Sequence, residues 1–144
     1  MPPTLHHLYI GLGSNLGDRE TTLQRALRLI AERVGRVERV SSFIETEPQG
    51  FLSEHKFLNA CCLVLTPLTP RQCLQETQAI ERRLGRREKT EDCRYHDRTI
   101  DIDLLLYDDL HVRETGLTLP HPRMQEREFV MTPLCEIEGT SHEL

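Results

Sequence analysis

Apolar residues are distributed along this chain in two patterns, short runs that favour β-strands and longer stretches with helical spacing. Four short runs predict strands, at 8–12, 37–45, 57–65 and in the segment that ends at Tyr107. Between the first two runs, apolar side chains recur at the i, i+3, i+4 and i+7 positions of one helix face. They are Leu23, Ala26, Leu27, Ile30, Ala31 and Val34.

A second helix is predicted to begin at Pro70, directly after Thr69. Threonine suits the N-cap, and proline suits the first helical position because the N–H that it lacks has no helical partner there. Glycine readily adopts the left-handed conformation that ends many helices, so Gly85 predicts the C-terminal end. The apolar seam of this helix consists of Cys73, Thr77, Ile80 and Leu84.

The order of these elements is β-α-β-β-α-β, which is typical of a ferredoxin-like α+β sandwich. Such a fold has one antiparallel sheet with two helices on one face, and we expect the ligand site under loops on the other face. A length of 144 residues fits a single domain over 1–144, in which we expect residues 139–144 to fray. The architecture hosts many activities, so the fold alone does not predict the function.

Charge and cysteine content exclude several classes of protein. The net charge of −5 argues against general nucleic-acid binding. The longest apolar stretches, such as 60–65, are too short to cross a bilayer, and the first seven residues do not resemble a signal peptide. The five cysteines form no Cys-X-X-Cys pair, which indicates reduced thiols in a cytoplasmic protein rather than disulfides or a zinc site. We therefore expect neither a nucleic-acid nor a membrane partner.

The segment Arg98–Tyr107 carries two carboxylates in a predicted strand. Side chains alternate faces along a strand, so Asp101 and Asp103 project from one face while Ile102 points the other way. Two interpretations fit this pair alone, a Mg²⁺ site that also takes phosphate oxygens or an edge strand whose aspartates face water. The arginine-rich segment before the strand favours the first, since metal-binding carboxylates beside arginines are typical of phosphoryl transfer.

Three separated blocks of the sequence resemble the 6-hydroxymethyl-7,8-dihydropterin pyrophosphokinase family. The blocks are YIGLGSNLG at 9–17, SSFIETEPQG at 41–50 with FLNA at 57–60, and RTIDID at 98–103 followed by 119–124 and 127–129. Their order and approximate spacing match along nearly the whole chain. The resemblance implies a folate-pathway enzyme that transfers pyrophosphate from ATP to the hydroxymethyl group of the reduced pterin and releases AMP.

The resemblance also implies roles on the nucleotide side. Asp101 and Asp103 match residues that hold two Mg²⁺ ions on the triphosphate. Arg86 and Arg98 match arginines that contact phosphate, where a planar guanidinium forms bidentate hydrogen bonds. These four residues form the expected catalytic set. The expected ATP-binding residues are Gln78, Arg86, Arg94, Arg98 and His121.

On the pterin side, the resemblance implies an aromatic clamp and an amide that reads the edge of the ring. Phe57 and Phe129 match the clamp, and Asn59 matches the amide. Phenylalanines are more often core residues, but positions i and i+2 of one strand share a face, so Phe57 and Asn59 are expected to point into the same pocket. Thr46 and Pro48 are expected to supply further groups to the pterin edge.

Departures from the family pattern lie mainly between the second helix and the aspartates. His96-Asp97 replaces a common Gly-Pro, Tyr95 is the aromatic residue where a tryptophan is frequent, and Pro122 replaces an aromatic. The chain also ends soon after Glu136, so we expect the C-terminal helix of longer relatives to be absent. We expect a monomer whose partners are its small-molecule substrates.

Two alternatives remain open from the sequence. A non-catalytic ferredoxin-like module that senses a nucleotide or pterin would bind its ligand even after Asp101 and Asp103 are replaced. A different Mg²⁺-dependent nucleotidyl transferase would release pyrophosphate rather than AMP. The paired carboxylates beside Arg98 favour the pyrophosphokinase, because a passive sensor has no need of them.

Overall fold

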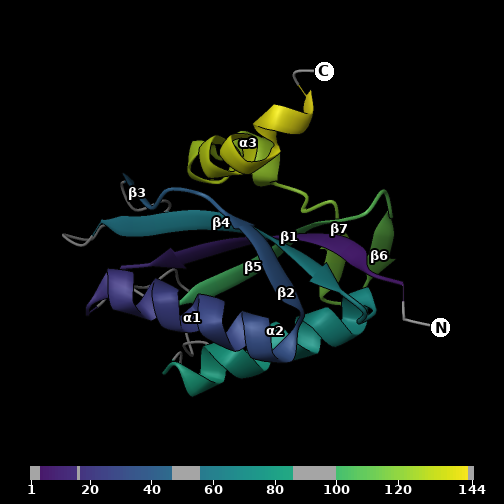
Figure 1. The fold of residues 1–144 in the computed structure, drawn as a ribbon, viewed down its shortest axis with the longest axis horizontal. Helices are drawn as coiled ribbons and strands as arrows, with labels where there is room; N and C mark the ends of the chain where they lie inside the picture. The colour runs from purple at the N-terminus through teal and green to yellow at the C-terminus, as the bar shows by residue number, and fades with distance from the viewer. Residues whose placement is uncertain (1–3, 16, 47–55, 86–99, 143–144) are drawn as a thin grey trace.

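An antiparallel sheet with helices on both faces forms the centre of the protein, whose residues 4–15, 17–46, 56–85 and 100–142 are described by the computed structural model (Figure 1). The strand order is β2-β4-β1-β5, and β3 also pairs with β4. The elements are β1 (His6–Ser14), α1 (Arg19–Arg33), β2 (Arg36–Val40), β3 (Ile44–Thr46), β4 (Phe57–Thr66), α2 (Pro70–Arg83), β5 (Asp101–Tyr107), β6 (Val112–Glu114), β7 (Leu117–Leu119), the short 3₁₀ helix η1 (Met124–Glu126) and α3 (Glu128–His142).

Helices α1 and α2 cover one face of the sheet, which confirms the predicted ferredoxin-like arrangement. Asp18 caps α1 by accepting a hydrogen bond from the Thr21 N–H at 3.2 Å. Thr69 caps α2 in a reciprocal capping box with Gln72, and Pro70 occupies the first turn as predicted. The main apolar core lies between these helices and the inward side chains of β1, β4 and β5. It includes Leu8, Ile10, Leu23, Ile30, Val64, Ile80 and Ile102.

The predicted strand at 37–45 is instead two strands, because Ser41 interrupts the ladder. The Cys61 N–H donates to the Ser41 side-chain oxygen at 2.9 Å, where an uninterrupted ladder would offer a backbone carbonyl. The Ser41 N–H in turn donates to the Cys61 carbonyl at 2.9 Å. Strand β2 therefore ends at Val40, and β3 resumes pairing with the start of β4.

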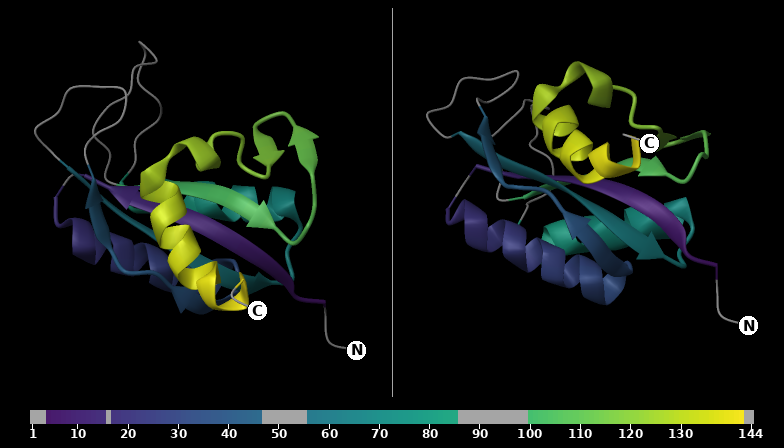
Figure 2. Two further views of the ribbon diagram at one scale, coloured as in Figure 1. Left: turned by 90° about the horizontal axis from the view of Figure 1, so that it is seen from above. Right: turned by 45° about the horizontal axis from the view of Figure 1, so that its top comes forward.

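Helix α3 covers the second face of the sheet, although we expected from the sequence that a C-terminal helix would be absent. Helix α3 extends to His142, which lies within the segment 139–144 that we expect to fray. It lies across the opposite side of the sheet from α1 and α2 (Figure 2). Val130, Leu134 and Ile137 are buried there against a second cluster formed by Cys61, Leu63, Leu105 and Met124. Pro133 lies inside the helix.

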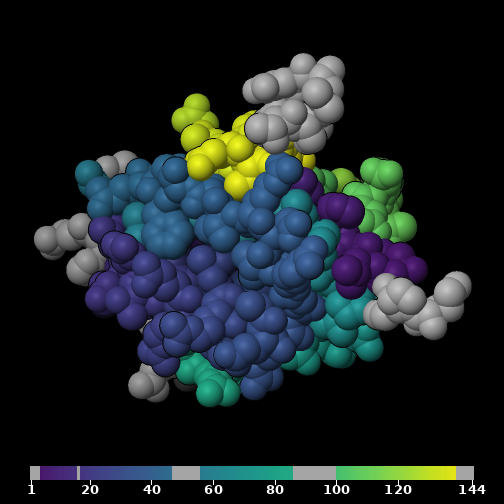
Figure 3. All heavy atoms as spheres, in the orientation of Figure 1, coloured from purple at the N-terminus to yellow at the C-terminus, as the bar shows by residue number. Residues whose placement is uncertain are grey.

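Polar contacts fasten α3 to the strand edge. The Arg39 guanidinium donates to the Ile137 carbonyl at 2.7 Å. Both the N–H and the hydroxyl of Ser42 donate to one Glu136 carboxylate oxygen, at 2.9 and 3.0 Å. The space-filling view shows α3 in direct contact with the strand edge (Figure 3). The residues that interrupt the predicted second strand thus provide the attachment point of the C-terminal helix.

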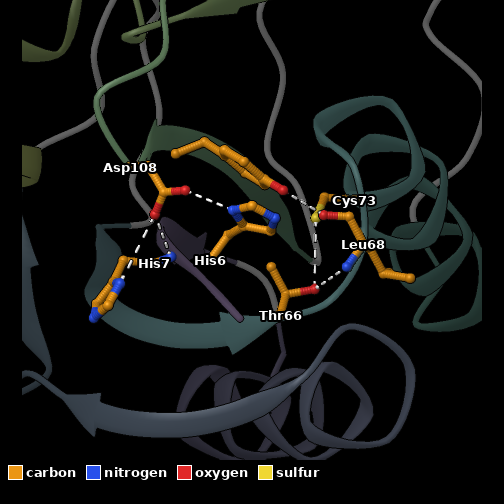
Figure 4. Close-up of polar contacts among 7 residues, drawn as sticks. His6, His7, Thr66, Leu68, Cys73 and Asp108 are labelled. Atoms are coloured by element: carbon orange, nitrogen blue, oxygen red, sulfur yellow. Dashed lines mark hydrogen bonds and ion pairs between the residues drawn. The ribbon is translucent and has the colours of Figure 1, made fainter. Parts of the chain in front are cut away.

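A polar cluster joins β1, β5 and the start of α2 at the end of the sheet distant from Asp101 (Figure 4). Asp108 accepts from the His7 N–H at 2.7 Å and contacts the His6 ring nitrogen at 2.6 Å. The His6 ring stacks on Tyr107, with ring centroids 4.9 Å apart. The Tyr107 hydroxyl donates to the Leu68 carbonyl at 2.6 Å. This cluster ties the start of β1 to the end of β5, beyond the register shift between Tyr9 and Ile10.

Candidate active site

One row of residues across three neighbouring strands brings together the two halves of the predicted site. Gly13 on the central strand β1 pairs with Asn59 on β4 and, on its other side, with Asp101 on β5. Gly11 likewise pairs with Cys61 and with Asp103. Neighbouring strands are about 4.8 Å apart, so the backbones of Asn59 and Asp101 are separated by about 10 Å. Gly13 is the residue of β1 that lies between Asn59 and Asp101 in this row.

The two aspartates lie on the same face of β5, as strand parity predicted. Asp101 and Asp103 are partly exposed, whereas Ile102 between them is buried in the main core. Their face is the one opposite α1 and α2. Among the described residues, no group of three or more His, Cys, Asp and Glu side chains is arranged to hold a metal ion. A pair of carboxylates nevertheless suits Mg²⁺, which commonly completes its coordination with phosphate oxygens and water.

A buried carboxylate supports the backbone between the two aspartates. Glu81 on α2 is only 9% exposed and accepts a hydrogen bond from the Ile102 N–H at 2.8 Å. Because β5 is an edge strand, this N–H points away from β1 and needs a partner outside the sheet. Sequence reasoning did not find this contact. The sequence feature that could have indicated it is the position of Glu81, four residues after Thr77 on the apolar seam of α2, where a charged side chain needs a buried partner.

At the other end of the row, the Asn59 amide is held in one orientation. Asn59 is 5% exposed, and its Nδ2 donates to the Thr46 hydroxyl at 2.6 Å. This contact places the other amide atom, Oδ1, toward Gly13. Phe57 occupies the same face of β4 and lies beside Gly13 as well. The structure therefore brings three of the predicted pterin-side residues, Thr46, Phe57 and Asn59, into one corner.

Arg19 braces this corner from the first turn of α1. Its guanidinium donates to the Glu45 carboxylate at 2.6 Å and to the Lys56 carbonyl at 2.9 Å. Glu45 directly precedes Thr46, and Lys56 directly precedes Phe57. One side chain thus ties together the end of β3 and the start of β4. No local pattern in the sequence predicts this contact, because it joins residues that are 26 and 37 positions apart.

A cavity of about 280 Å³ lies at the free edge of β5. Its walls combine apolar side chains from three elements with two of the predicted site residues, Asp103 and His121. The sequence did not single out the apolar part of this wall, because leucines and a threonine at these positions resemble ordinary core residues. The wall includes Leu74, Leu104, Leu117 and Thr118.

His121 is oriented by its own backbone neighbourhood. Its N–H donates to the Leu105 carbonyl at 2.9 Å, and the Arg123 N–H donates to its ring Nδ1 at 3.2 Å. Burial, together with the charges of Arg127 and Arg123, lowers the pKa of His121, although Asp101 opposes this shift. The imidazole is therefore neutral near pH 7 and carries its proton on Nε2. That N–H is a donor available to an anionic ligand in the cavity.

The remaining predicted site residues are not gathered by the described structure. Arg86, Arg94, Arg98 and Pro48 lie outside the described residues. Gln78 is exposed on α2, one turn beyond Leu74, and is not part of the cavity wall. Phe129 stands in the first turn of α3, half-buried beside the second apolar cluster, with the Arg127 guanidinium 5.6 Å from its ring centre.

Known proteins resemble this chain in sequence and in fold. A family model described as 7,8-dihydro-6-hydroxymethylpterin-pyrophosphokinase matches residues 9–139. The 2-amino-4-hydroxy-6-hydroxymethyldihydropteridine pyrophosphokinase of Porphyromonas gingivalis is 48% identical over 136 residues, covering 94% of this chain and 92% of that protein. The mitochondrial folate synthesis bifunctional protein of Pisum sativum is 39% identical over 132 residues, covering 92% of this chain and 25% of that protein.

The fold likeness extends to solved structures. A crystal structure of HPPK-DHPS in complex with substrates superposes with a TM-score of 0.75 over 92% of this chain. The sequences are 15% identical, so this likeness concerns the fold alone. The present chain spans 40% of that longer chain.

Proposed function

This chain belongs to the 7,8-dihydro-6-hydroxymethylpterin-pyrophosphokinase family, and from that membership we propose how its residues carry out the reaction. The enzyme transfers a pyrophosphoryl group from ATP to the hydroxymethyl group of 6-hydroxymethyl-7,8-dihydropterin, a step of folate biosynthesis. The substrate hydroxyl attacks the β-phosphorus, the bond to the α-phosphate oxygen breaks, and AMP leaves. Such a reaction depends on positioning and charge stabilisation more than on covalent catalysis.

The row Asn59–Gly13–Asp101 is the observation that carries the proposal. It places an amide that reads a heterocycle and a carboxylate that holds a metal on one face, with about 10 Å between their strands. That separation suits a small bicyclic ring with a hydroxymethyl arm that points toward a phosphate chain. A sensor of either ligand alone has no need of both ends of this row.

The residues present fit the binding of magnesium. Asp101 and Asp103 project from the same face of β5 and are partly exposed, so both carboxylates can share one site with phosphate oxygens. The two carboxylates hold two Mg²⁺ ions together with the triphosphate. Bound Mg²⁺ neutralises charge on the phosphates and makes the substrate hydroxyl more acidic.

The cavity at the edge of β5 receives the nucleoside of ATP. Its leucines suit the flat faces of a base, while Asp103 and His121 mark the side where the phosphates lie. His121 donates its Nε2–H to a phosphate oxygen. Arg86, Arg94 and Arg98 contribute guanidinium groups to the phosphates, and Gln78 contacts the adenosine side.

The pterin lies over Gly13, at the corner formed by β3 and β4. The Asn59 Oδ1 accepts from a ring N–H, since its Nδ2 already donates to Thr46. Phe57 and Phe129 cover the two faces of the ring, and Pro48 completes the edge together with Thr46. In this arrangement the hydroxymethyl group is directed along the row toward Asp101.

We infer that the protein acts as a monomer with one domain over 1–144. All described residues of the row, the cavity and the Asn59 corner come from one chain, from the main sheet together with α2, β7 and the segment that follows β7, which supports this inference. The exposed large apolar side chains of the described residues are Leu5 before β1, Val40 at the end of β2 and Leu110 between β5 and β6. No helix in the described part of the chain is long and apolar enough to span a membrane. A cytoplasmic enzyme is consistent with the buried thiols of Cys61, Cys62 and Cys73.

Product analysis tests the proposal. The protein is incubated with ATP, Mg²⁺ and 6-hydroxymethyl-7,8-dihydropterin, and nucleotides are separated by chromatography. Pterin-dependent AMP that disappears in Asp101→Ala supports the reaction and the metal-binding pair together. Release of inorganic pyrophosphate would instead identify a nucleotidyl transferase, and pterin binding without AMP would identify a sensor.

A further inference from the structure

Gly13 occupies the crossing point of the candidate active site. It is the residue of β1 that pairs with both Asn59 and Asp101, and it is buried. Its φ angle does not lie in the left-handed region that favours glycine, in contrast to Gly17, Gly85 and Gly116. The reason for a glycine at this position is therefore the space around it rather than its backbone conformation.

The Asn59 amide and the Phe57 ring border that space. A Cβ atom at residue 13 would lie 2.8 Å from Oδ1 of Asn59 and 3.5 Å from a ring carbon of Phe57. The first distance is too short for real Cβ atoms, so the amide would have to move. It is not free to do so without cost, because its Nδ2 donates to Thr46 at 2.6 Å and the side chain is buried.

Gly11 provides a matched contrast on the same strand and face. It lies two residues earlier and pairs with Asp103, the second aspartate. The nearest atoms to a Cβ at residue 11 belong to the Leu105 side chain, at an ordinary contact distance of 3.5 Å or more. A methyl group is thus compatible with the structure at residue 11 but not at residue 13.

We propose that Gly13 is a positioning residue that sets the orientation of the Asn59 amide and thereby the specificity for the pterin. The inference rests on the proposed function, in which Asn59 reads the edge of the pterin ring. The missing side chain of Gly13 allows Oδ1 to remain directed across β1, where it accepts from a ring N–H. A larger residue forces the amide to break its bond to Thr46 or to turn its acceptor away.

The experiment compares Gly13→Ala with Gly11→Ala in AMP formation and in pterin binding followed by the intrinsic fluorescence of the pterin. Loss of one well-placed hydrogen bond to a buried group predicts a pterin affinity about 10-fold to 100-fold weaker in Gly13→Ala. The ATP affinity of this variant stays within about threefold of the wild type, since the nucleotide cavity is on the far side of β5. Gly11→Ala changes neither the pterin affinity nor the ATP affinity by more than about threefold.

A double-mutant cycle separates positioning from general damage to the fold. In the Asn59→Ala background the clashing atom is absent, so adding Gly13→Ala is expected to weaken pterin binding by no more than about twofold further. Equal losses in both backgrounds would overturn the inference. Wild-type pterin affinity in Gly13→Ala would overturn it as well.

Two further outcomes keep the inference distinct from the proposed function. If Gly13→Ala alone does not fold, the double variant is expected to regain cooperative unfolding, and its failure to do so overturns the positioning role. If Asn59→Ala binds pterin as tightly as the wild type while AMP is still formed, the positioning role is overturned but the reaction stands. Absence of AMP from the wild-type protein contradicts the proposed function itself.

Discussion

The buried carboxylate of Glu81 accepts a hydrogen bond from the Ile102 N–H at 2.8 Å, directly between the two aspartates of β5. The contact joins the second helix to the edge strand and fixes the backbone from which both carboxylates project. Without an acceptor, this N–H would be buried with no partner, at a cost of about 1–3 kcal/mol.

Glu81→Met is therefore expected to lower the free energy of unfolding by about 1–3 kcal/mol and to reduce turnover, because it removes the acceptor at Ile102. Glu81→Gln keeps an amide oxygen at the same place and should retain most of the stability and turnover. Glu76 lies on the same helix as Glu81 and forms an exposed ion pair of 3.5 Å with Arg33 of α1, so Glu76→Met is the matched control. Urea denaturation and steady-state rates distinguish these cases. Equal effects at residues 76 and 81 would show that the buried contact has no special role.

The aspartate pair is expected to affect turnover more than nucleotide binding. Asp103→Asn preserves shape but removes charge, so the Mg²⁺ concentration that gives half-maximal rate should rise while the maximal rate falls at least 10-fold. The thermal midpoint should stay near that of the wild type, because the side chain is partly exposed. A rate profile that responds to Mg²⁺ as the wild type does would remove Asp103 from the metal-binding set.

Asp108 is expected to stabilise the fold in a pH-dependent manner. Burial acts to raise the pKa of Asp108, but the hydrogen bonds from the His7 N–H and the His6 ring lower it below the ordinary value of 3.8. A lowered folded-state pKa gives stability that is present above the ordinary value and is lost as the pH falls through the folded value. Asp108→Asn should cost about 1 kcal/mol near pH 7, since the group is partly exposed, and the difference should shrink below about pH 4.

The neighbouring carboxylate supplies a control for that experiment. Asp109 is exposed, and Asp109→Asn should leave the unfolding curve within about 0.5 kcal/mol of the wild type at every pH. The pterin KM should not change in either variant, because this cluster lies at the opposite end of β5 from Asp101. If the free energy of unfolding of the wild type exceeds that of Asp108→Asn by the same amount down to pH 3, the assigned ionisation of Asp108 is contradicted.

Binding of ATP is expected to draw a proton onto His121. Burial and the charges of Arg127 and Arg123 lower the pKa of His121 in the free protein, so the imidazole is neutral above the ordinary value of 6.5 and for some distance below it. Phosphate charge in the cavity raises that pKa, which predicts proton uptake at a pH between the pKa of the free protein and the pKa of the ATP complex. Calorimetric titration in two buffers of different ionisation enthalpy measures the uptake. It should disappear in His121→Gln, and an undiminished proton uptake in that variant would assign the effect to another group.

The contrast between Asp101 and Glu81 indicates what the sequence alone could predict. The common face of Asp101 and Asp103 follows from strand periodicity, and the caps at Asp18 and Thr69 follow from local hydrogen bonding. Phe57 and Asn59 share a face for the same reason. Each of these relations spans only a few residues, so sequence spacing is sufficient to predict it.

The features that sequence reasoning missed all depend on contacts between distant segments. The hydroxyl of Ser41 interrupts a strand because Cys61 donates to it, and no local pattern signals that interruption. Helix α3 persists through Pro133 because its buried face packs on the sheet and Arg39 fixes its carbonyl at Ile137. The leucines of the nucleotide cavity resemble core residues until β5, β7 and α2 are placed together.

The floor of the pterin corner at residue 13 is peptide backbone, since Gly13 presents no side chain there. A compound designed to lie on that floor would contact backbone atoms, which most substitutions leave in place. A larger residue at Gly13 could exclude such a compound, but the same atom would displace Asn59 and disfavour the natural substrate. Inhibitors anchored on this strand therefore leave the enzyme few routes to resistance.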